Sequence, residues 1–305
     1  MVSDLVLRHC FGDAGSRYNG CVLRIEQIAD ELNHEGLAVS LYDYETGLSW
    51  ARQGDRWFHS ASTIKVAVLF ALFGAVDAGR FTLDSRLHVR NRFYSIVDGT
   101  PFRVSAARDG DAKVHEAIGR TMRIEDLARR MIVTSSNLAT NLLVDLVGVE
   151  AAQQMLARHG ITGIELARGV EDEKAFDESF NNRITANGLV TLFRAIHECR
   201  GLSADSSQRM MDILFGQEFR SGLPAGLPDD VRANARIANK TGEISVAAHD
   251  AGMVFLPNRK PYVLAILTEL DSNTASNSMQ RVARVSSIVY EWLITTPEAR
   301  TESTS

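Results

Sequence analysis

The sequence predicts an α+β fold. An antiparallel sheet is assembled from both chain ends and flanked by helices, as in an α/β sandwich, and an all-helical lobe is inserted between the ends. Three observations lead to this prediction. Strand-like patterns lie near both ends of the chain, helix-like patterns fill its middle, and an amphipathic helix stands at each end. With 305 residues, 45% of them hydrophobic, the chain is long enough to bury a core of this kind.

The N-terminal elements are a helix and a hairpin. We expect residues 1–16 to be loosely ordered, whereas residues 21–33 carry apolar side chains at helical spacing, which predicts an amphipathic helix. Residues 37–44 alternate apolar and polar side chains, and residues 48–53 follow them after a short turn. This arrangement predicts a β-hairpin.

Helical patterns then continue from Ser62 to about Arg200. A polar stretch at residues 169–182 interrupts them, and a loop of that length inside a compact domain is usually functional or disordered. Three strands and a final amphipathic helix are predicted near the C-terminus, at residues 236–240, 248–255, 262–270 and 278–294. We therefore expect one sheet to join the two chain ends, with the terminal helices on one of its faces.

These elements divide the chain into two predicted lobes. The predicted parts are a flexible N-terminus at 1–16, an α/β lobe made of 17–60 and 225–296, a helical lobe at 61–224 and a tail at 297–305. A cleft between two lobes is a common place for an active site, so we expect the functional site there.

Composition narrows the classes of function. A net charge of −5 without a basic stripe argues against a nucleic-acid binder. No apolar run is long enough to span a bilayer, so no membrane partner is expected. The three cysteines lie far apart without metal-ligand spacing, so free thiols and no metal are expected. The first twenty residues lack the features of a secretory signal, which predicts a cytoplasmic protein if the chain is native and a periplasmic or secreted one if a signal was removed.

The most informative motif is Ser62-Thr63-Ile64-Lys65, where a loop ends and an apolar helix begins. Residues three apart share a helix face, so the Ser62 hydroxyl and the Lys65 amine can meet. A serine becomes a nucleophile when a neighbouring base takes its proton, and a lysine becomes a base when burial or nearby positive charge lowers its pKa. The apolar run after Lys65 supplies burial, and the helix start supplies partial positive charge. The motif therefore offers a nucleophile with its activator.

On its own, this motif also fits an N-cap serine with a solvated lysine. Two further motifs follow in order, Ser135-Ser136-Asn137 and Lys240-Thr241-Gly242. Alone, the first fits a polar break between two helices and the second a turn that enters a strand. The ordered set of three is typical of class A β-lactamases and penicillin-binding proteins.

With these motifs, the chain resembles the class A-like serine β-lactamase family, which is related to penicillin-binding proteins and DD-peptidases. The resemblance covers roughly residues 20–295. Three more segments contribute to it, at 92–102, 168–176 and 249–252. The resemblance implies the same architecture that the order of elements predicts.

The resemblance also implies a role for each motif residue. Ser62 attacks an amide carbonyl and forms an acyl-enzyme, and Lys65 accepts its proton directly or through water. Ser135 passes a proton to the departing nitrogen. Asn137 holds the side-chain amide of the substrate and contacts Lys65. The family needs no metal and no organic cofactor for this chemistry.

The third motif is implied to recognise the substrate, a small molecule with a carboxylate and most simply a β-lactam. Lys240 supplies positive charge to that carboxylate, and Thr241 hydrogen-bonds it. Gly242 lets the substrate approach the strand closely. The backbone N–H groups of Ser62 and Glu243 form the oxyanion hole. We expect the protein to act as a monomer.

The sequence departs from the family pattern at two places. The middle motif has Ser136 where the family usually has aspartate. The long loop reads Arg168-Gly169-Val170-Glu171, one residue longer than the family's Arg-x-Glu and without its following Leu and Asn. Glu171, Asp172 and Glu173 therefore compete for the role of the base that clears the acyl-enzyme. We expect Glu171 to fill it, with a solvated acidic patch as the alternative.

Several functions stay open at this stage. The first is a serine β-lactamase. The second is a serine amidase, peptidase or esterase on the same scaffold, and the third is a penicillin-binding sensor without turnover. A glutaminase-type amidohydrolase is disfavoured because Lys-Thr-Gly suits an acyl donor with a carboxylate. A triad of Ser62 with His249 and Asp250 is also disfavoured, because adjacent strand residues face opposite ways, and His59 is expected to be structural.

Overall fold

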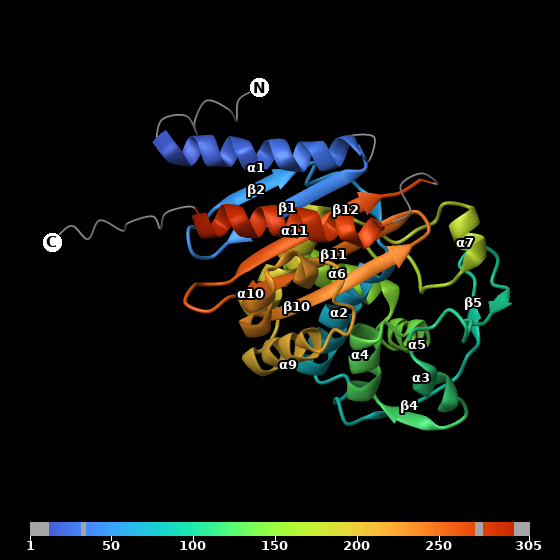
Figure 1. The fold of residues 1–305 in the computed structure, drawn as a ribbon. Helices are drawn as coiled ribbons and strands as arrows, with labels where there is room; N and C mark the ends of the chain where they lie inside the picture. Colours follow the sequence, from blue (N-terminus) through green and yellow to red (C-terminus); the bar gives the residue numbers. More distant parts are fainter. Residues whose placement is uncertain (1–11, 32–34, 272–276, 296–305) are drawn as a thin grey trace.

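A sheet assembled from both chain ends forms the centre of the molecule (Figure 1). The computed structural model describes residues 12–31, 35–271 and 277–295. The sheet has five antiparallel strands in the order β10-β11-β12-β1-β2. Their bounds are β1 Leu37–Asp43, β2 Ser49–Arg52, β10 Arg236–Ile244, β11 Ala247–Phe255 and β12 Tyr262–Glu269. The predicted fold class is confirmed.

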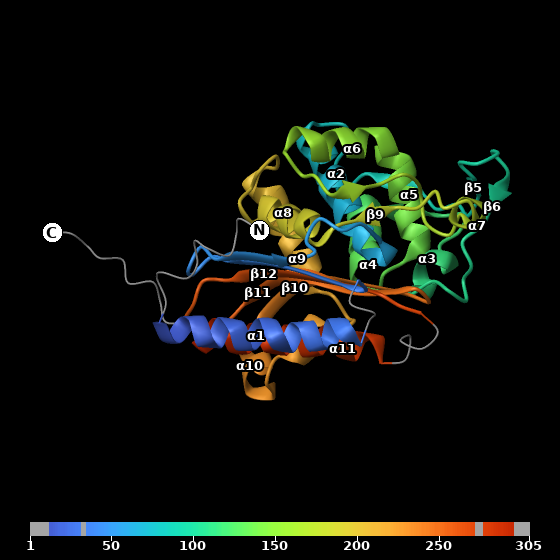
Figure 2. The same cartoon turned by 90° about the horizontal axis from the view of Figure 1, so that it is seen from above.

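Two terminal helices cover one face of this sheet, as Figure 2 shows. They are α1, Gly12–Asp30, and α11, Ser278–Thr295, which lie side by side. α1 begins at Gly12, so residues 12–16 belong to a helix and not to the loosely ordered N-terminus that the sequence predicts. The predicted order of residues 1–11, the helix end at 32–33 and the tail at 297–305 lie outside the described residues.

The other face of the sheet carries the helical block, which packs around α2, Lys65–Asp77. The surrounding helices are α4 Ile124–Val133, α5 Asn137–Val147, α6 Val149–Arg158, α8 Ala186–His197 and α9 Ala204–Phe215. Shorter helices are η2 Ala61–Ile64, α3 Ala112–Glu116, α7 Glu173–Asp177, η3 Leu223–Gly226 and α10 Asp229–Asn234. Among the described residues, no helix has the length and apolarity that a bilayer crossing needs.

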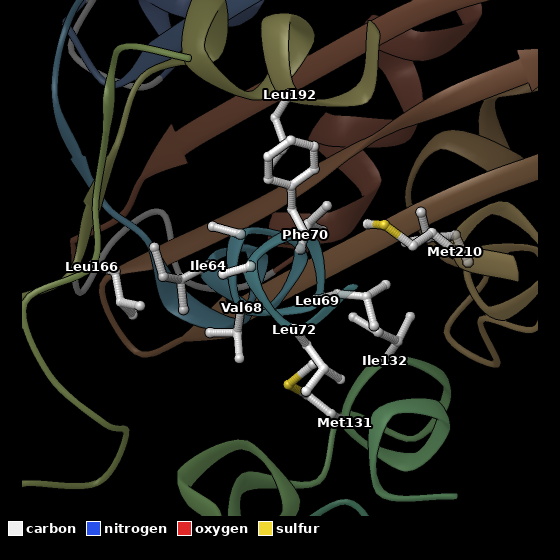
Figure 3. Packing of buried hydrophobic residues seen from close by; sticks show 14 of the residues in the cluster. Ile64, Val68, Leu69, Phe70, Leu72, Met131, Ile132, Leu166, Leu192 and Met210 are labelled. Atoms are coloured by element: carbon white, nitrogen blue, oxygen red, sulfur yellow. The ribbon is translucent and has the colours of Figure 1, made fainter. Parts of the chain in front are cut away.

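α2 is apolar on every side, which explains its central position. Figure 3 shows Phe70 pointing toward Leu192 of α8, and Leu72 toward Met131 of α4. Burying one such side chain contributes about 1.5–3 kcal/mol. Lys65 is the first residue of this helix and is 0% exposed, so the core of the helical block holds its amine out of water.

Short strands lie in the segments between the helices, in one sheet of three strands and two sheets of two, and the sequence patterns did not predict them. They are β3 Phe58–His59, β4 Arg86–His88, β5 Phe93–Tyr94, β6 Pro101–Phe102, β7 Thr121–Arg123, β8 Ile164–Glu165 and β9 Arg183–Ile184. A strand of two or three residues is too short to display an alternating pattern.

The long polar loop at residues 169–182 is ordered by its own ends. The buried Arg168 side chain donates to the Phe180 carbonyl at 2.7 Å, to Asn181 Oδ1 at 2.8 Å and to the Gly169 carbonyl at 3.0 Å. Asn182 Oδ1 accepts the backbone N–H of Arg168 at 3.0 Å. These bonds close the segment into a compact loop with adjacent ends.

Candidate active site

A cleft of about 790 Å³ lies where the helical block meets the edge strand β10. The predicted site residues that line it are Ser62, Ser135, Asn137, Glu171, Thr241 and Glu243. The two lysines of the motifs lie beneath its surface, since Lys65 and Lys240 are both 0% exposed. The fold thus brings together three motifs and a loop that lie far apart in the sequence.

Lys65 has its amine in a fully polar pocket at the end of an apolar helix. Its Nζ donates to the Ser135 carbonyl at 2.7 Å, to Ser135 Oγ at 3.0 Å and to Asn137 Oδ1 at 2.8 Å. Burial, assisted by the positive charge of Lys240, holds the pKa of Lys65 well below its usual range. The lowered pKa favours the neutral amine, which is the form that can act as a base.

Ser62 lies in the 3₁₀ turn η2 and is half-buried at the cleft surface. The sequence predicts that its hydroxyl meets the Lys65 amine. In the described structure the three bonds of Lys65 Nζ go to Ser135 and Asn137 instead, while the Lys65 backbone N–H bonds the Ser62 carbonyl. A proton passing from Ser62 to Lys65 therefore travels through a bridging group or after a small shift of the side chains.

Ser135 connects the two lysines. Lys240 Nζ donates to Ser135 Oγ at 3.1 Å and to the Thr241 carbonyl at 2.9 Å. Burial lowers the pKa of Lys240 to about 7. Because both amines donate to Ser135 Oγ, its two lone pairs are occupied and its own proton is directed elsewhere. The Ser135 hydroxyl can therefore donate into the cleft.

Asn137 bridges a cation and an anion. Its Oδ1 accepts from Lys65, and its Nδ2 donates to Glu171 Oε1 at 2.7 Å. The other carboxylate oxygen of Glu171 accepts the Ser105 backbone N–H at 3.0 Å and lies 3.5 Å from Arg108 Nη2. The Glu171 side chain is 11% exposed, so its carboxylate faces the interior of the cleft.

The two acids after Glu171 have other tasks. Asp172 is buried, caps α7 through the Ala175 N–H and accepts the Ile96 N–H at 3.0 Å. Glu173 is 70% exposed and pairs with Arg108 at 2.7 Å. The geometry of the loop therefore agrees with the choice of Glu171 among the three acids.

Three residues of the site have left-handed backbone that non-glycine residues rarely adopt. Ala61, just before Ser62, has φ +45°, while Ser135 has φ +61° and Glu171 has φ +60°. Each such conformation costs on the order of 1–3 kcal/mol and persists only where the surrounding contacts impose it. Such residues are typical of functional sites whose side chains are fixed in advance.

Lys240-Thr241-Gly242 lies within the edge strand β10 and not in a turn before it. A Cβ on Gly242 would lie 3.0 Å from the Ser62 backbone nitrogen and 3.1 Å from that of Thr63. The glycine thus lets the strand approach the nucleophile segment, whereas the sequence predicts that it admits the substrate. Thr241 and Glu243 lie one strand repeat apart and both line the cleft.

His249 and Asp250 bond to groups other than Ser62, which agrees with the expectation that they form no triad with it. Both are 0% exposed. His249 Nε2 donates to the His59 carbonyl at 2.8 Å while its Nδ1 accepts the Thr268 N–H at 3.1 Å. Asp250 accepts the Leu223 N–H at 2.7 Å. His59 lines the cleft, and its Nδ1 accepts the Ala61 N–H at 3.0 Å, which supports the segment before Ser62.

The sequence patterns missed the loop at residues 105–111. This loop supplies Ser105 and Arg108 to Glu171, and Asp109 to the start of α5. A Cβ on Gly110 would lie 2.0 Å from the Thr134 carbonyl oxygen, so the loop packs directly against the middle motif. Its one sequence signal is the turn-like run Asp109-Gly110-Asp111, which carries no chemistry by itself.

Comparisons with known proteins agree with this geometry. A family model described as "Beta-lactamase enzyme family" matches residues 24–293. A mutant of PBP-A, solved as its acyl-enzyme complex with penicillin G, is 28% identical, with 90% of this chain and 97% of that chain covered and a TM-score of 0.73.

Two β-lactamase structures are similar to the same extent. A β-lactamase from Sphaerobacter thermophilus is 25% identical, with 92% of this chain and 99% of that chain covered and a TM-score of 0.73. A variant of the last common ancestor of Gram-negative class A β-lactamases is 26% identical, with 90% of this chain and 100% of that chain covered and a TM-score of 0.74.

Proposed function

The chain belongs to the Beta-lactamase enzyme family, and from this premise we propose that it opens a β-lactam amide through a covalent acyl-serine intermediate on Ser62. The observation that carries the proposal is the hydrogen-bonded chain of Lys65, Ser135 and Lys240 at the cleft that Ser62 lines. A hydroxyl held between two buried amines is suited to moving protons and not to stabilising the fold alone.

In the acylation step, Ser62 Oγ attacks the amide carbonyl and gives its proton to neutral Lys65. Ser135 then delivers a proton to the departing nitrogen as that bond breaks, and Lys65 returns the proton taken from Ser62 to Ser135 Oγ. The backbone N–H groups of Ser62 and Glu243 are the proposed oxyanion hole. The loss of one such donor typically costs on the order of a hundredfold in rate.

In the deacylation step, Glu171 removes a proton from the water that attacks the ester on Ser62. The inward position of its carboxylate supports this role. Thr241 is proposed to bind the substrate carboxylate and Lys240, beneath the cleft surface, to attract it through its positive charge, so the substrate is a small acid, with a β-lactam as the first choice. An amidase, peptidase or esterase of other small acids would use the same groups.

A penicillin-binding protein without turnover is the second candidate. One observation favours it, because the Glu171 carboxylate already accepts from Asn137 and Ser105 and lies beside Arg108. The carboxylate oxygens that accept these hydrogen bonds have less capacity left to accept one from an attacking water. Deacylation through such a group would be slow.

The intact mass of the protein, followed over time with benzylpenicillin, separates these candidates. A β-lactamase shows an adduct that disappears as the penicillin is consumed, whereas a penicillin-binding protein shows one that persists. The Ser62→Ala variant, which keeps the fold, should form no adduct in either case. The absence of any adduct on the wild-type protein, together with unconsumed penicillin, would overturn both candidates and favour an enzyme for another acyl substrate.

A further inference from the structure

We propose that Asp109 is a positioning residue for acylation, and that it supplies from the loop at 105–111 the carboxylate that Ser136 does not provide. The inference rests on the proposed function of Ser62. Asp109 touches no substrate group in this scheme. It acts through the start of α5, where Asn137 is the first helical residue.

The Asp109 carboxylate is fully enclosed and fully hydrogen-bonded. Its side chain is 0% exposed, although it carries an acidic group. Its five donors are the Asp111 N–H at 3.0 Å, His115 Nε2 at 3.0 Å, Ser136 Oγ at 3.3 Å, the Asn137 N–H at 3.2 Å and the Leu138 N–H at 2.8 Å. A buried charge is tolerated only with such compensation.

Three of these donors belong to the N-terminal turn of α5. The first N–H groups of a helix have no partner within it, and their partial positive charge favours an anion. Asp109 accepts two of them, from Asn137 and Leu138, while Ser136 Oγ accepts the N–H of Ala139. Ser136 therefore caps the helix as a neutral group and also donates to the carboxylate of Asp109.

This anchoring fixes the groups that hold Lys65. The backbone of Asn137 is bound to Asp109, and the side chain of Asn137 accepts from Lys65 and donates to Glu171. Ser135 lies two residues earlier in left-handed backbone, with its carbonyl and hydroxyl both on Lys65. A shift at the start of α5 would therefore move all three acceptors of the Lys65 amine.

The charge of Asp109 also acts on Lys65 at longer range. Asp109 and Glu171 both raise the pKa of Lys65, against burial and Lys240, which lower it. Removal of the Asp109 charge should therefore lower the pKa of Lys65 further. The acid limb of the acylation rate, where Lys65 gains its proton, should then move to lower pH.

Asp109→Asn tests both effects, with Asp111→Asn as the matched control. The side chain of the neighbouring Asp111 is also buried, at 4% exposed, but it pairs with Arg130 at 2.7 Å and caps α3. We expect Asp109→Asn to slow acylation by about tenfold to a hundredfold, the usual effect of losing hydrogen bonds to a charged group. The acid limb of the acylation rate of Asp109→Asn should move to lower pH, whereas the acid limb of Asp111→Asn should stay at the wild-type pH. If Asp109→Asn keeps both the wild-type acylation rate and the wild-type acid limb, the proposal is overturned.

An exchange variant decides the matter if Asp109→Asn does not fold. Asp109→Ser combined with Ser136→Asp returns a carboxylate to the start of α5 from the other side. We expect the pair to acylate at least tenfold faster than Asp109→Ser alone, or to fold where that variant does not. An exchange variant that is no better than Asp109→Ser shows that the carboxylate does not position this site.

Two measurements keep this test separate from the proposed function. Amide hydrogen exchange at Asn137 and Leu138 should speed up in Asp109→Asn and not in Asp111→Asn. A fluorophosphonate can also probe Ser62, because Oγ bonds to phosphorus, fluoride leaves and the hydroxyl proton passes to Lys65. If wild-type protein never reacts with benzylpenicillin, the proposed function fails, while amide exchange and phosphonylation still decide the role of Asp109.

Discussion

At the scale of single residues, the hydrogen bonds and the protonation state of the Lys65 amine depend on each other. Its amine makes three hydrogen bonds, the full number that an ammonium group can donate, and it is 0% exposed. The same amine must be neutral when it takes the proton of Ser62. The lowered pKa of the buried group favours loss of one proton, after which the neutral amine keeps two donors and has a lone pair to accept the proton of Ser62 in the proposed mechanism.

Lys65→Arg should therefore be nearly as damaging as Lys65→Ala. An arginine keeps the positive charge but does not lose its proton in a protein, so it cannot serve as the base. We expect the acylation rate of both variants to fall by about a hundredfold or more, as for the loss of a general base. The acylation rate is measured from the intact mass of the protein at successive times after benzylpenicillin is added. If Lys65→Arg keeps most of its activity, the general base is another group.

Lys240 makes a prediction that depends on pH. With a pKa of about 7, Lys240 is charged below this pH and progressively neutral above it. A carboxylate substrate should lose its advantage over its methyl ester as the pH rises through about 7, seen as a falling ratio of their kcat/KM values. Lys240→Ala should abolish this pH dependence and harm the acid more than the ester. Equal losses for both would assign Lys240 to the protonation of Ser135 instead of to substrate charge.

Glu171→Gln should stop the reaction after acylation. The amide keeps the size of the side chain but cannot accept the proton of a water. We expect acyl-enzyme to form at the wild-type rate and then to accumulate, as intact mass will show. Glu173→Gln is the matched control and should turn over normally, because Glu173 is 70% exposed.

Asp172→Asn is a second control, with a different expectation. Since Asp172 caps α7, its loss should lower stability by about 1 kcal/mol while the adduct still clears. An adduct trapped by Asp172→Asn and not by Glu171→Gln would show that the neighbouring acid is the base.

At the scale of elements, the contact between β10 and η2 decides where the nucleophile lies. Gly242→Ala should displace Ser62 from the strand, because the new Cβ would lie 3.0 Å from a backbone nitrogen that has little room to move. We expect kcat/KM to fall by at least about tenfold, since small misplacements of reacting groups are costly. Gly20→Ala in α1 is the control. Nothing lies within 4 Å of its Cβ, so activity should be unchanged.

The sequence predicts the elements that are long enough to show a period. The hairpin of β1 and β2, the three C-terminal strands and the terminal helices all have one, and the structure contains them. The Lys65 helix shows no such period. It is predicted as buried because its apolar run is continuous. By contrast, strand pairs of two or three residues such as β3 and β9 display no period.

The active-site cleft is predictable only in part, because motifs name residues but do not orient them. The resemblance implies the contact between Lys65 and Asn137, whereas the hydrogen bonds of Lys65 to Ser135 depend on the left-handed backbone at Ser135, which no pattern indicates. No sequence pattern indicates Asp109 as a site residue, for a similar reason. Its partners become neighbours only through the packing of a loop against α5, and its own sequence surroundings resemble an ordinary turn.

At the scale of the whole molecule, the two faces of the sheet carry two cores. One core joins the helical block to the sheet through residues such as Met253 and Leu267, and the other joins the sheet to α1 and α11. The prediction divides the chain into a lobe at 61–224 and a discontinuous lobe around it. The first core, however, contains residues of both predicted lobes.

We expect both parts to unfold in one transition. A shared core couples them, so neither should survive alone. Trp50 and Trp292, whose rings lie 5.8 Å apart on the side of the terminal helices, report on that side through fluorescence once the third tryptophan is removed in a Trp57→Phe variant. Far-ultraviolet circular dichroism reports mainly on the helical block. The two melting curves should coincide, and a helical signal that persists after the fluorescence change would show that the lobes are independent.

The strand order has a consequence for the synthesis of the protein on the ribosome. Leu37 in β1 pairs with Thr268 in β12, so β1 stays without this neighbour until almost the whole chain has been made, a delay on the order of ten seconds or more. An unpaired strand edge invites contacts with other chains. The nascent protein should therefore depend on chaperones for that interval. Because Lys240 also arrives late, the nascent chain should be unable to react with penicillin before the last strands are in place.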